Sequence, residues 1–136
     1  ELKKTIVFIT HDLDEALKIG ERISILRDGS VVQDDNPQKI ILNPSDDYVS
    51  DFIKDINRSR VIKAKSIMSK SISIKKETVP IIDSNMVLED VLQEITKTKH
   101  YFVLVKDSTN KIIGKITLKE LLNGIQRPKQ EIKKYA

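Results

Sequence analysis

The chain has 136 residues, of which 39% are hydrophobic and 32% charged, a composition that suits one ordinary domain or two small modules. Its longest apolar runs have four or five residues, far below the roughly 20 that a transmembrane helix needs, and its start lacks the pattern of a signal peptide, so we expect no direct membrane insertion. The absence of cysteine excludes a disulfide framework and thiolate chemistry and suits the cytosol.

Charge is distributed unevenly along the chain. Residues 1–60 carry nine Lys and Arg against twelve Asp and Glu, whereas residues 61–136 carry fifteen against eight. A lysine-rich solvated surface explains this basic excess, and so does a site for a phosphorylated ligand or proximity to an anionic membrane face. Few aromatic residues, and no helix-turn-helix or RNA-stacking pattern, argue against nucleic acid as a partner.

A strand and a short helix are predicted at the start of the chain. The run 5–10 is continuously apolar and β-branched, as in a parallel strand that is covered on both faces. Asp12 can cap the helix that follows, Glu15 can close a capping box with it, and Gly20 ends the helix. His11 follows the strand directly, and because ligands of open α/β sheets bind beyond the carboxyl ends of the strands, it is a candidate functional residue.

A hairpin and two helices are predicted next. The dipeptide Asp28-Gly29 lies between two alternating runs, at 22–27 and 30–33, and this pattern is a strong signal for a β-hairpin. One short helix begins at Asn36-Pro37, and a second helix, over residues 45–56, carries apolar side chains at helical spacing.

A linker at residues 58–62 is expected to separate this first module, residues 1–57, from a second module over residues 63–126. The elements predicted for the second module are a helical turn at 64–68, a strand at 71–74, an irregular stretch at 77–86, a helix over 86–98, strands at 101–105 and 111–117, and a closing helix at 118–125. Residues 127–136 are expected to form a charged, frayed tail.

Three stretches of the first module resemble, in the same order, the end of the nucleotide-binding domain of ABC ATPases. They are Thr5-Ile-Val-Phe-Ile-Thr-His11-Asp12-Leu-Asp-Glu15-Ala16, Arg22-Ile-Ser-Ile-Leu-Arg-Asp-Gly29 and Asn43-Pro-Ser-Asp-Asp-Tyr-Val-Ser-Asp-Phe52. The last is similar to the Asn-Pro-x-x-Asp-Tyr-Val stretch of the importers for glycine betaine, proline and choline. The resemblance implies that residues 1–57 are the C-terminal part of such a domain.

This resemblance also implies a role for His11. It would be the switch histidine of the parent ATPase, which contacts the γ-phosphate of ATP and helps to position the attacking water, in a domain that uses ATP with magnesium. None of the four glycines begins a G-x-x-x-x-G-K-[ST] phosphate loop. We therefore expect a piece of a longer ATPase that begins after the catalytic carboxylate and does not hydrolyse ATP alone.

Residues 63–126 are similar to one CBS motif, a βαββα unit. The closing stretch Ile113-Gly114-Lys-Ile-Thr117-Leu-Lys-Glu120 follows the family pattern of Gly, two residues, Thr or Ser, two residues and Asp, except that glutamate stands at the last position. The resemblance implies that Thr117 approaches phosphate or ribose and that Glu120 binds the ribose hydroxyls of an adenine nucleotide such as ATP, AMP or cyclic di-AMP. Tyr101 or Phe102 could stack on the base.

A structural explanation of the same residues stays open. Thr117 ends a strand, and Glu120 lies in the first turn of a helix, where the helix dipole favours a carboxylate without any ligand. His100 has no second His, Asp or Cys at ligand spacing, so we predict no metal site there.

The sequence thus predicts an α+β chain: the C-terminal part of an ABC ATPase domain followed by a CBS motif. Its parent would couple ATP hydrolysis to uptake of glycine betaine, proline, carnitine or choline, with a membrane permease subunit as partner, in the cytoplasm at the inner face of the cell membrane. The CBS motif would sense an adenine nucleotide or ionic strength and pair with a second copy in a homodimer. Alternatives are a CBS motif that dimerises without ligand, or an importer for amino acids, which the Asn43–Val49 stretch disfavours.

Overall fold

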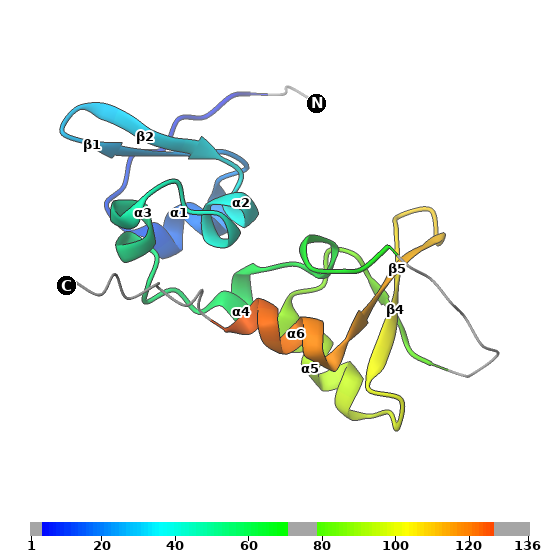
Figure 1. Ribbon diagram of the computed structural model, residues 1–136. Coiled ribbons are helices and arrows are strands. Elements are labelled where there is room, and N and C mark those ends of the chain that lie inside the picture. The colour runs from blue at the N-terminus through cyan, green and yellow to red at the C-terminus, as the bar shows by residue number, and fades with distance from the viewer. Residues whose placement is uncertain (1–3, 71–78, 127–136) are drawn as a thin grey trace, which may run out of the picture. The chain divides into compact units, whose positions relative to one another are not determined.

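The computed structural model of the protein describes residues 4–70 and 79–126 (Figure 1). The chain divides after Asn57 into two compact units, residues 1–57 and 58–136. Among the described residues, no helix has both the length and the apolar character that a membrane span requires. The strand predicted at 71–74 and the tail at 127–136 lie outside the described residues.

The first unit is a two-stranded hairpin with three short helices on one side of it (Figure 1). Its elements are α1 (Leu13–Ile19), β1 (Ile23–Arg27), β2 (Ser30–Asp35), α2 (Pro37–Leu42) and α3 (Asp47–Phe52). Its core consists of aliphatic side chains from these elements and the residue after α3, namely Leu17, Ile23, Ile25, Ile40, Ile41, Val49 and Ile53.

The predicted hairpin turn is confirmed. Asp28 and Gly29 both have positive φ, 51° and 78°, which is the backbone of a type I′ turn and matches the right-handed twist of the two strands. Strand β1 pairs with β2 antiparallel, with Leu26 opposite Val31, and a register shift lies between Ile25 and Leu26. The helix predicted over 45–56 is shorter, since α3 ends at Phe52.

The strand predicted at 5–10 is wrong. Residues 4–10 have no regular structure, and Ile6, Val7 and Ile9 are 82%, 85% and 91% exposed. A strand exists only through hydrogen bonds to a neighbouring strand, and none lies beside this run in the part of the chain that the structure describes.

The helix predicted after this run is confirmed, with one correction. Asp12 caps α1 by accepting a hydrogen bond from the backbone N–H of Glu15, at 3.2 Å. Glu15 does not close a capping box, because its carboxylate accepts a hydrogen bond from the hydroxyl of Thr10 instead, at 3.0 Å.

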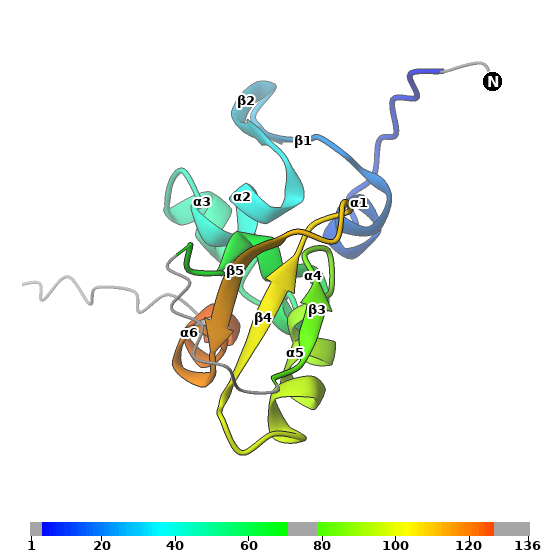
Figure 2. The same cartoon turned by 90° about the vertical axis from the view of Figure 1, so that its right-hand side faces the viewer.

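The second unit is a three-stranded sheet with helices packed on one face (Figure 2). Its elements are α4 (Arg58–Val61), a 3-10 turn (Ala64–Ser66), β3 (Ile81–Asp83), α5 (Leu88–Thr96), β4 (Phe102–Lys106), β5 (Ile112–Thr117) and α6 (Leu118–Ile125). The sheet order is β3-β4-β5, with β4 parallel to β3 and antiparallel to β5.

The core of this unit joins the sheet to its helices. Val103, Val105 and Ile116 of the sheet are fully buried, as are the apolar positions of the helices, Leu88, Val91, Ile95 and Leu121. The three-to-four-residue spacing of those positions explains why α5 was predictable as an amphipathic helix.

Two segments of the second unit differ from the sequence prediction. Residues 58–62 are part of this unit rather than the expected linker, because Arg58–Val61 form α4 and Ile62 is fully buried. The stretch 77–86, predicted to be irregular, contains β3, in which Ile82 is buried and pairs with Val105. Strand β3 has only three residues, too few for an alternating pattern to be visible in the sequence.

Candidate functional site

The register of β4 and β5 brings the four candidate residues of the CBS motif together. Phe102, the first residue of β4, lies opposite Thr117, the last residue of β5. The carbonyl oxygen of Tyr101 accepts a hydrogen bond from the backbone N–H of Leu118, at 2.8 Å, which ties the start of β4 to the first turn of α6. Glu120 lies in that same turn.

Thr117 and Glu120 bind each other. The backbone N–H and the hydroxyl of Thr117 both donate to Oε2 of Glu120, at 2.8 and 2.9 Å, and the N–H of Glu120 donates back to Oγ1 of Thr117, at 3.3 Å. These contacts form a complete capping box at the N-terminus of α6. Both side chains are thus used structurally here, and their ligand role stays a prediction.

Tyr101 combines an unusual backbone conformation with high exposure. Its φ is 55°, in the left-handed region that non-glycine residues rarely adopt, and 64% of the residue is exposed. The ring of neighbouring Phe102 is half-buried and meets the ring of His100 edge-on, with centroids 6.2 Å apart. Of the two aromatic candidates, Tyr101 therefore offers the exposed ring.

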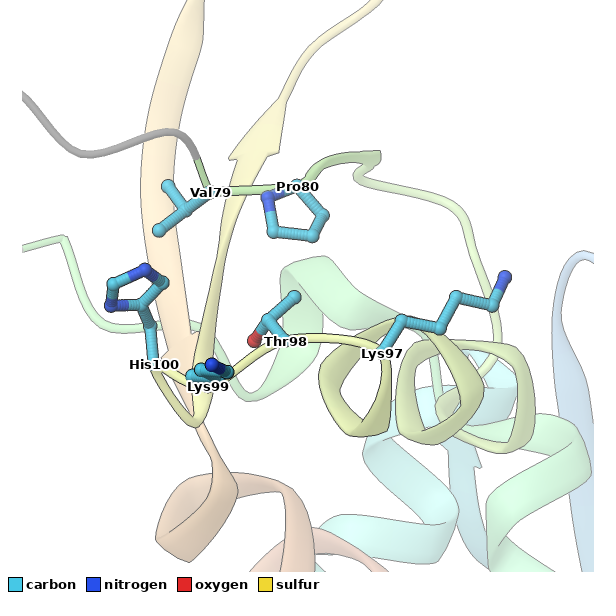
Figure 3. Close-up of a pocket in the computed structure, with 6 residues that line it drawn as sticks. All are labelled: Val79, Pro80, Lys97, Thr98, Lys99 and His100. Atoms are coloured by element: carbon cyan, nitrogen blue, oxygen red, sulfur yellow. The ribbon is translucent and has the colours of Figure 1, made fainter.

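A shallow cavity of about 390 Å3 lies at the residues that precede Tyr101 in the chain, up to His100 (Figure 3). One wall is the stretch before β3, Val79 and Pro80, and the other is the turn after α5, Lys97 to His100. The wall before β3 is fixed to the sheet, because the carbonyl oxygen of Pro80 accepts a hydrogen bond from the N–H of Leu104, at 3.0 Å.

The cavity brings in cationic groups that the sequence analysis did not assign to the site. Lys97 and Lys99 line it together with Thr98 and His100, and Lys97 also pairs with Glu94, at 2.7 Å. The signal in the sequence was the basic excess of residues 61–136, which is too diffuse to single out this turn. Neighbouring lysines at the rim of a cavity attract anions.

His11 lies in the first unit, apart in sequence from the other candidates. Its side chain is exposed and follows an irregular segment rather than a strand end. The N–H of Asp12 donates to the hydroxyl of Thr10, at 3.0 Å, so the backbone around His11 is organised as the start of α1.

The described residues do not fit a magnesium site near His11. The carboxylate of Asp12 caps α1, and that of Glu15 accepts the hydroxyl of Thr10. Across residues 4–70 and 79–126, no three His, Asp or Glu side chains gather in a way that could hold a metal ion.

Comparison with known proteins identifies the second unit and gives its context. Residues 64–127 match the family model of the CBS domain. The chain is 37% identical over 92% of its length to the trimethylamine N-oxide transport ATP-binding protein TmoW of Pelagibacter ubique, and it covers 36% of that protein. It is 56% identical over 50% of its length to the glycine betaine/carnitine transport ATP-binding protein GbuA of Listeria monocytogenes, and it covers 17% of that protein.

A third similarity is to a solved structure, a CBS-domain pair with bound AMP from Klebsiella pneumoniae. It shares 15% identity and a TM-score of 0.33, covering 88% of this chain and 86% of that one, which is too slight to carry an argument. The α+β class, the CBS domain and the resemblance to ATP-binding subunits of osmoprotectant importers are confirmed. Residues 64–127 thus match the CBS domain, and the chain matches the C-terminal, CBS-containing region of the ATP-binding subunits of ABC importers for glycine betaine, carnitine and trimethylamine N-oxide.

Proposed function

We propose that the chain is the C-terminal, regulatory portion of an ATP-binding subunit that couples ATP hydrolysis to the uptake of osmoprotectants. The similarity to such subunits over 92% of the chain, across both units, supports this role. In the assembled importer the subunit would bind a membrane permease and lie in the cytoplasm at the inner face of the membrane. His11 would be its switch histidine.

The role of His11 is tested in the full-length subunit assembled with its permease. His11→Ala should lower ATP turnover by several orders of magnitude if His11 positions the attacking water, since such groups contribute about 10²–10⁴-fold. The matched control is Lys18→Ala, which truncates an exposed side chain of the neighbouring helix α1 and should leave the turnover number nearly unchanged. Equal turnover in the wild type and His11→Ala would contradict the role.

We propose further that the CBS domain senses an adenine nucleotide, ATP, AMP or cyclic di-AMP, bound along the cavity. The observation that carries this proposal is the pair of lysines at the cavity, Lys97 and Lys99, shortly before the exposed residue Tyr101 in the chain. The cations suit phosphate groups, and the ring offers a face on which a base can stack. Thr117 and Glu120, which the backbone bond between Leu118 and Tyr101 keeps near Tyr101, would contact the ribose or phosphate.

The same site would respond to ionic strength. Attraction between a phosphate and exposed lysines is screened over about 8–10 Å at physiological salt, so nucleotide affinity should fall as salt rises. One site would then respond both to nucleotide concentration and to ionic strength.

Calorimetry with ATP, AMP and cyclic di-AMP tests the nucleotide proposal. Lys99→Ala should weaken binding by about tenfold if a charged hydrogen bond to phosphate is lost. Lys111→Ala is the matched control, because it removes the same charge from an exposed lysine at the β4–β5 hairpin. Equal loss in both variants, or no binding of any of the three nucleotides, would overturn the proposal.

A second candidate function is a CBS domain that dimerises without ligand. The mutual hydrogen bonds of Thr117 and Glu120 favour it, because they satisfy both residues with no nucleotide present. Strand β3 lies at an edge of the sheet and exposes 53% of Ile81, which a second copy could cover. A dimer that forms without nucleotide and binds none of the three would establish this function.

A further inference from the structure

The capping box uses every polar hydrogen that Thr117 possesses. The N–H and the hydroxyl of Thr117 both donate to Oε2 of Glu120, and Oγ1 of Thr117 accepts the N–H of Glu120. A carboxylate oxygen has two lone pairs, so the two donors from Thr117 fill Oε2. The two residues form a closed set of three hydrogen bonds.

A nucleotide would need the same atoms. A phosphate oxygen accepts hydrogen bonds, so it could bind Thr117 only if the hydroxyl hydrogen left Glu120. A ribose presents two neighbouring hydroxyl donors, and a bidentate contact, with one hydroxyl on each carboxylate oxygen, uses both oxygens of Glu120. Oε2 of Glu120 becomes available only when at least one bond to Thr117 breaks.

We propose that the Thr117–Glu120 capping box competes with the nucleotide. Its hydrogen bonds occupy the groups that the nucleotide would use, and they must break when the nucleotide binds. This proposal rests on the proposed nucleotide site. The affinity of the site then depends on how far the hydrogen bonds to the nucleotide outweigh the hydrogen bonds of the cap that binding breaks. The first turn of α6 should therefore change when the nucleotide binds, because binding breaks a hydrogen bond from Thr117 to the carboxylate of Glu120.

The length of the Glu120 side chain makes this competition possible. Glutamate reaches back from the first turn of α6 to both the N–H and the hydroxyl of Thr117. Aspartate at this position is one methylene shorter, so it keeps the charge but reaches back to Thr117 less easily than glutamate. The backbone N–H of residue 120 still donates to Oγ1 of Thr117, so Glu120→Asp weakens the reciprocal half of the box and leaves the N-cap in place.

The test is nucleotide affinity, measured by calorimetry on the wild type, Glu120→Asp and Glu120→Gln. An N-cap contact is worth roughly a five- to tenfold change in an equilibrium constant, so Glu120→Asp should bind nucleotide about five- to tenfold more tightly than the wild type. Glu120→Gln keeps the reach of the side chain and an acceptor oxygen, so it should retain the box and bind no more tightly than the wild type.

Glu89→Asp provides the matched control. Glu89 lies in the first turn of α5 and accepts a hydrogen bond from Arg60, at 3.1 Å, so the substitution makes the same change in the neighbouring helix. Its nucleotide affinity should equal that of the wild type. A gain in Glu89→Asp as large as in Glu120→Asp would overturn the proposal.

Hydrogen exchange at the amide of Thr117 gives a second measurement. This amide should exchange slowly in the free wild type, faster when nucleotide saturates the site, and fast in Glu120→Asp in either state. Exchange that nucleotide leaves unchanged in the wild type would contradict the opening of the box.

The outcomes separate this inference from the nucleotide site on which it rests. Tighter binding to Glu120→Asp supports both only together with faster exchange of the Thr117 amide in that variant, because the family pattern places aspartate at this position and a better ribose contact alone would leave the exchange unchanged. Equal or weaker binding to Glu120→Asp overturns the competitor and leaves the nucleotide site standing. An equal gain in Glu120→Asp and Glu120→Gln also overturns it, because the charge of Glu120 would then be the cause. No binding to any variant overturns both proposals.

Discussion

The Nε of Arg58 donates a hydrogen bond to the carbonyl oxygen of Gly124, 3.2 Å away, although 66 residues separate them in the sequence. Gly124 lies in the last turn of α6, where free carbonyl groups carry the negative end of the helix dipole. Arg58 is only 8% exposed, and burial lowers the pKa of its guanidinium. The first residue of the second unit is thus anchored to the end of its last helix.

Replacing Arg58 should destabilise the second unit. Arg58→Met keeps much of the aliphatic volume but removes a buried, charged donor from Gly124, so we expect the free energy of unfolding to fall by about 1.5–3 kcal/mol. Arg60→Met is the control, because Arg60 is exposed and pairs with Glu89 at the surface, a contact worth less than about 1 kcal/mol. Urea unfolding followed through the amide signals of α5 and α6 measures both, and equal losses would contradict the anchor.

Arg58 also illustrates why the linker was not predictable. Lys54 to Arg60 is a polar run, and polarity usually marks a solvated connection. The arginine is buried because the carbonyl oxygen of Gly124 meets it, and a contact over such a separation leaves no local pattern in the sequence. The hairpin at Asp28-Gly29 was predictable for the opposite reason: the turn geometry is decided by two adjacent residues.

Gly114 is required by the close approach of another segment. A Cβ at this position would lie 2.7 Å from the carbonyl oxygen of Ser69 and 2.8 Å from Sδ of Met68. Ser69 and Lys115 exchange two backbone hydrogen bonds of 3.0 Å, so the backbone at Ser69 cannot retreat without losing them. The family pattern pointed to a glycine here, and the structure supplies its physical reason.

Gly114→Ala should therefore lower the free energy of unfolding of the second unit by about 1–3 kcal/mol, as overpacking does. Met68→Ala removes the contact of the added Cβ with the sulfur but not its contact with the carbonyl oxygen of Ser69. In a Met68→Ala background, Gly114→Ala should therefore still lower the free energy of unfolding, but by less than it does in the wild type. Thermal unfolding by circular dichroism compares the three. Full recovery would show that the sulfur, not the backbone, needs the glycine.

The sequence predicted Tyr101, Phe102, Thr117 and Glu120 as ligand residues, and this role stays a prediction; the hydrogen bonds between Thr117 and Glu120 were not predicted. The spacing of Thr117 and Glu120 fits both a ligand motif and a capping box, since both place a hydroxyl and an acid three residues apart. The choice between them depends on side-chain torsions, which spacing does not specify. The two walls of the cavity are Val79-Pro80 and Lys97–His100, and the pairing of β3 with β4 brings them together. The sequence analysis did not predict β3, so it could not predict the cavity.

Asp107 organises the β4–β5 turn and should make it sensitive to acid. Its Oδ1 accepts hydrogen bonds from the hydroxyl of Thr109, at 2.6 Å, and from the N–H groups of Thr109 and Lys111, and these bonds, led by the hydroxyl, lower the pKa of its carboxyl. A lowered folded-state pKa means that the stabilisation is present above the unfolded-state value of about 3.9 and is lost as pH falls toward the lower folded value.

Thr109→Val removes the leading cause and should raise the pKa of Asp107 toward its ordinary range, so stability should depend less on pH below about 4 than in the wild type. Titration of the Asp107 carboxyl by NMR gives the shift directly, and urea midpoints at neutral and acid pH give its effect on folding. Thr98→Val is the control, since its hydroxyl bonds only to a nearby helix carbonyl, that of Ile95, among the contacts described. An unchanged Asp107 titration in Thr109→Val would contradict this account of the turn.

Self-association should run through the CBS domain rather than through the apolar run at the start of the chain. Ile81 is 53% exposed on the edge strand β3, and Val7 is 85% exposed in an irregular segment. A residue on a preformed strand loses little backbone freedom when a second copy covers it, whereas the run at 5–10 is not in a strand and has no regular backbone that a second copy could extend. We therefore expect a homodimer at micromolar concentration, whose dissociation constant rises at least about tenfold in Ile81→Lys and changes little in Val7→Lys.

Light scattering over a concentration series measures both variants. A wild-type monomer would refute the dimer, and dissociation by Val7→Lys alone would move the interface to the first unit.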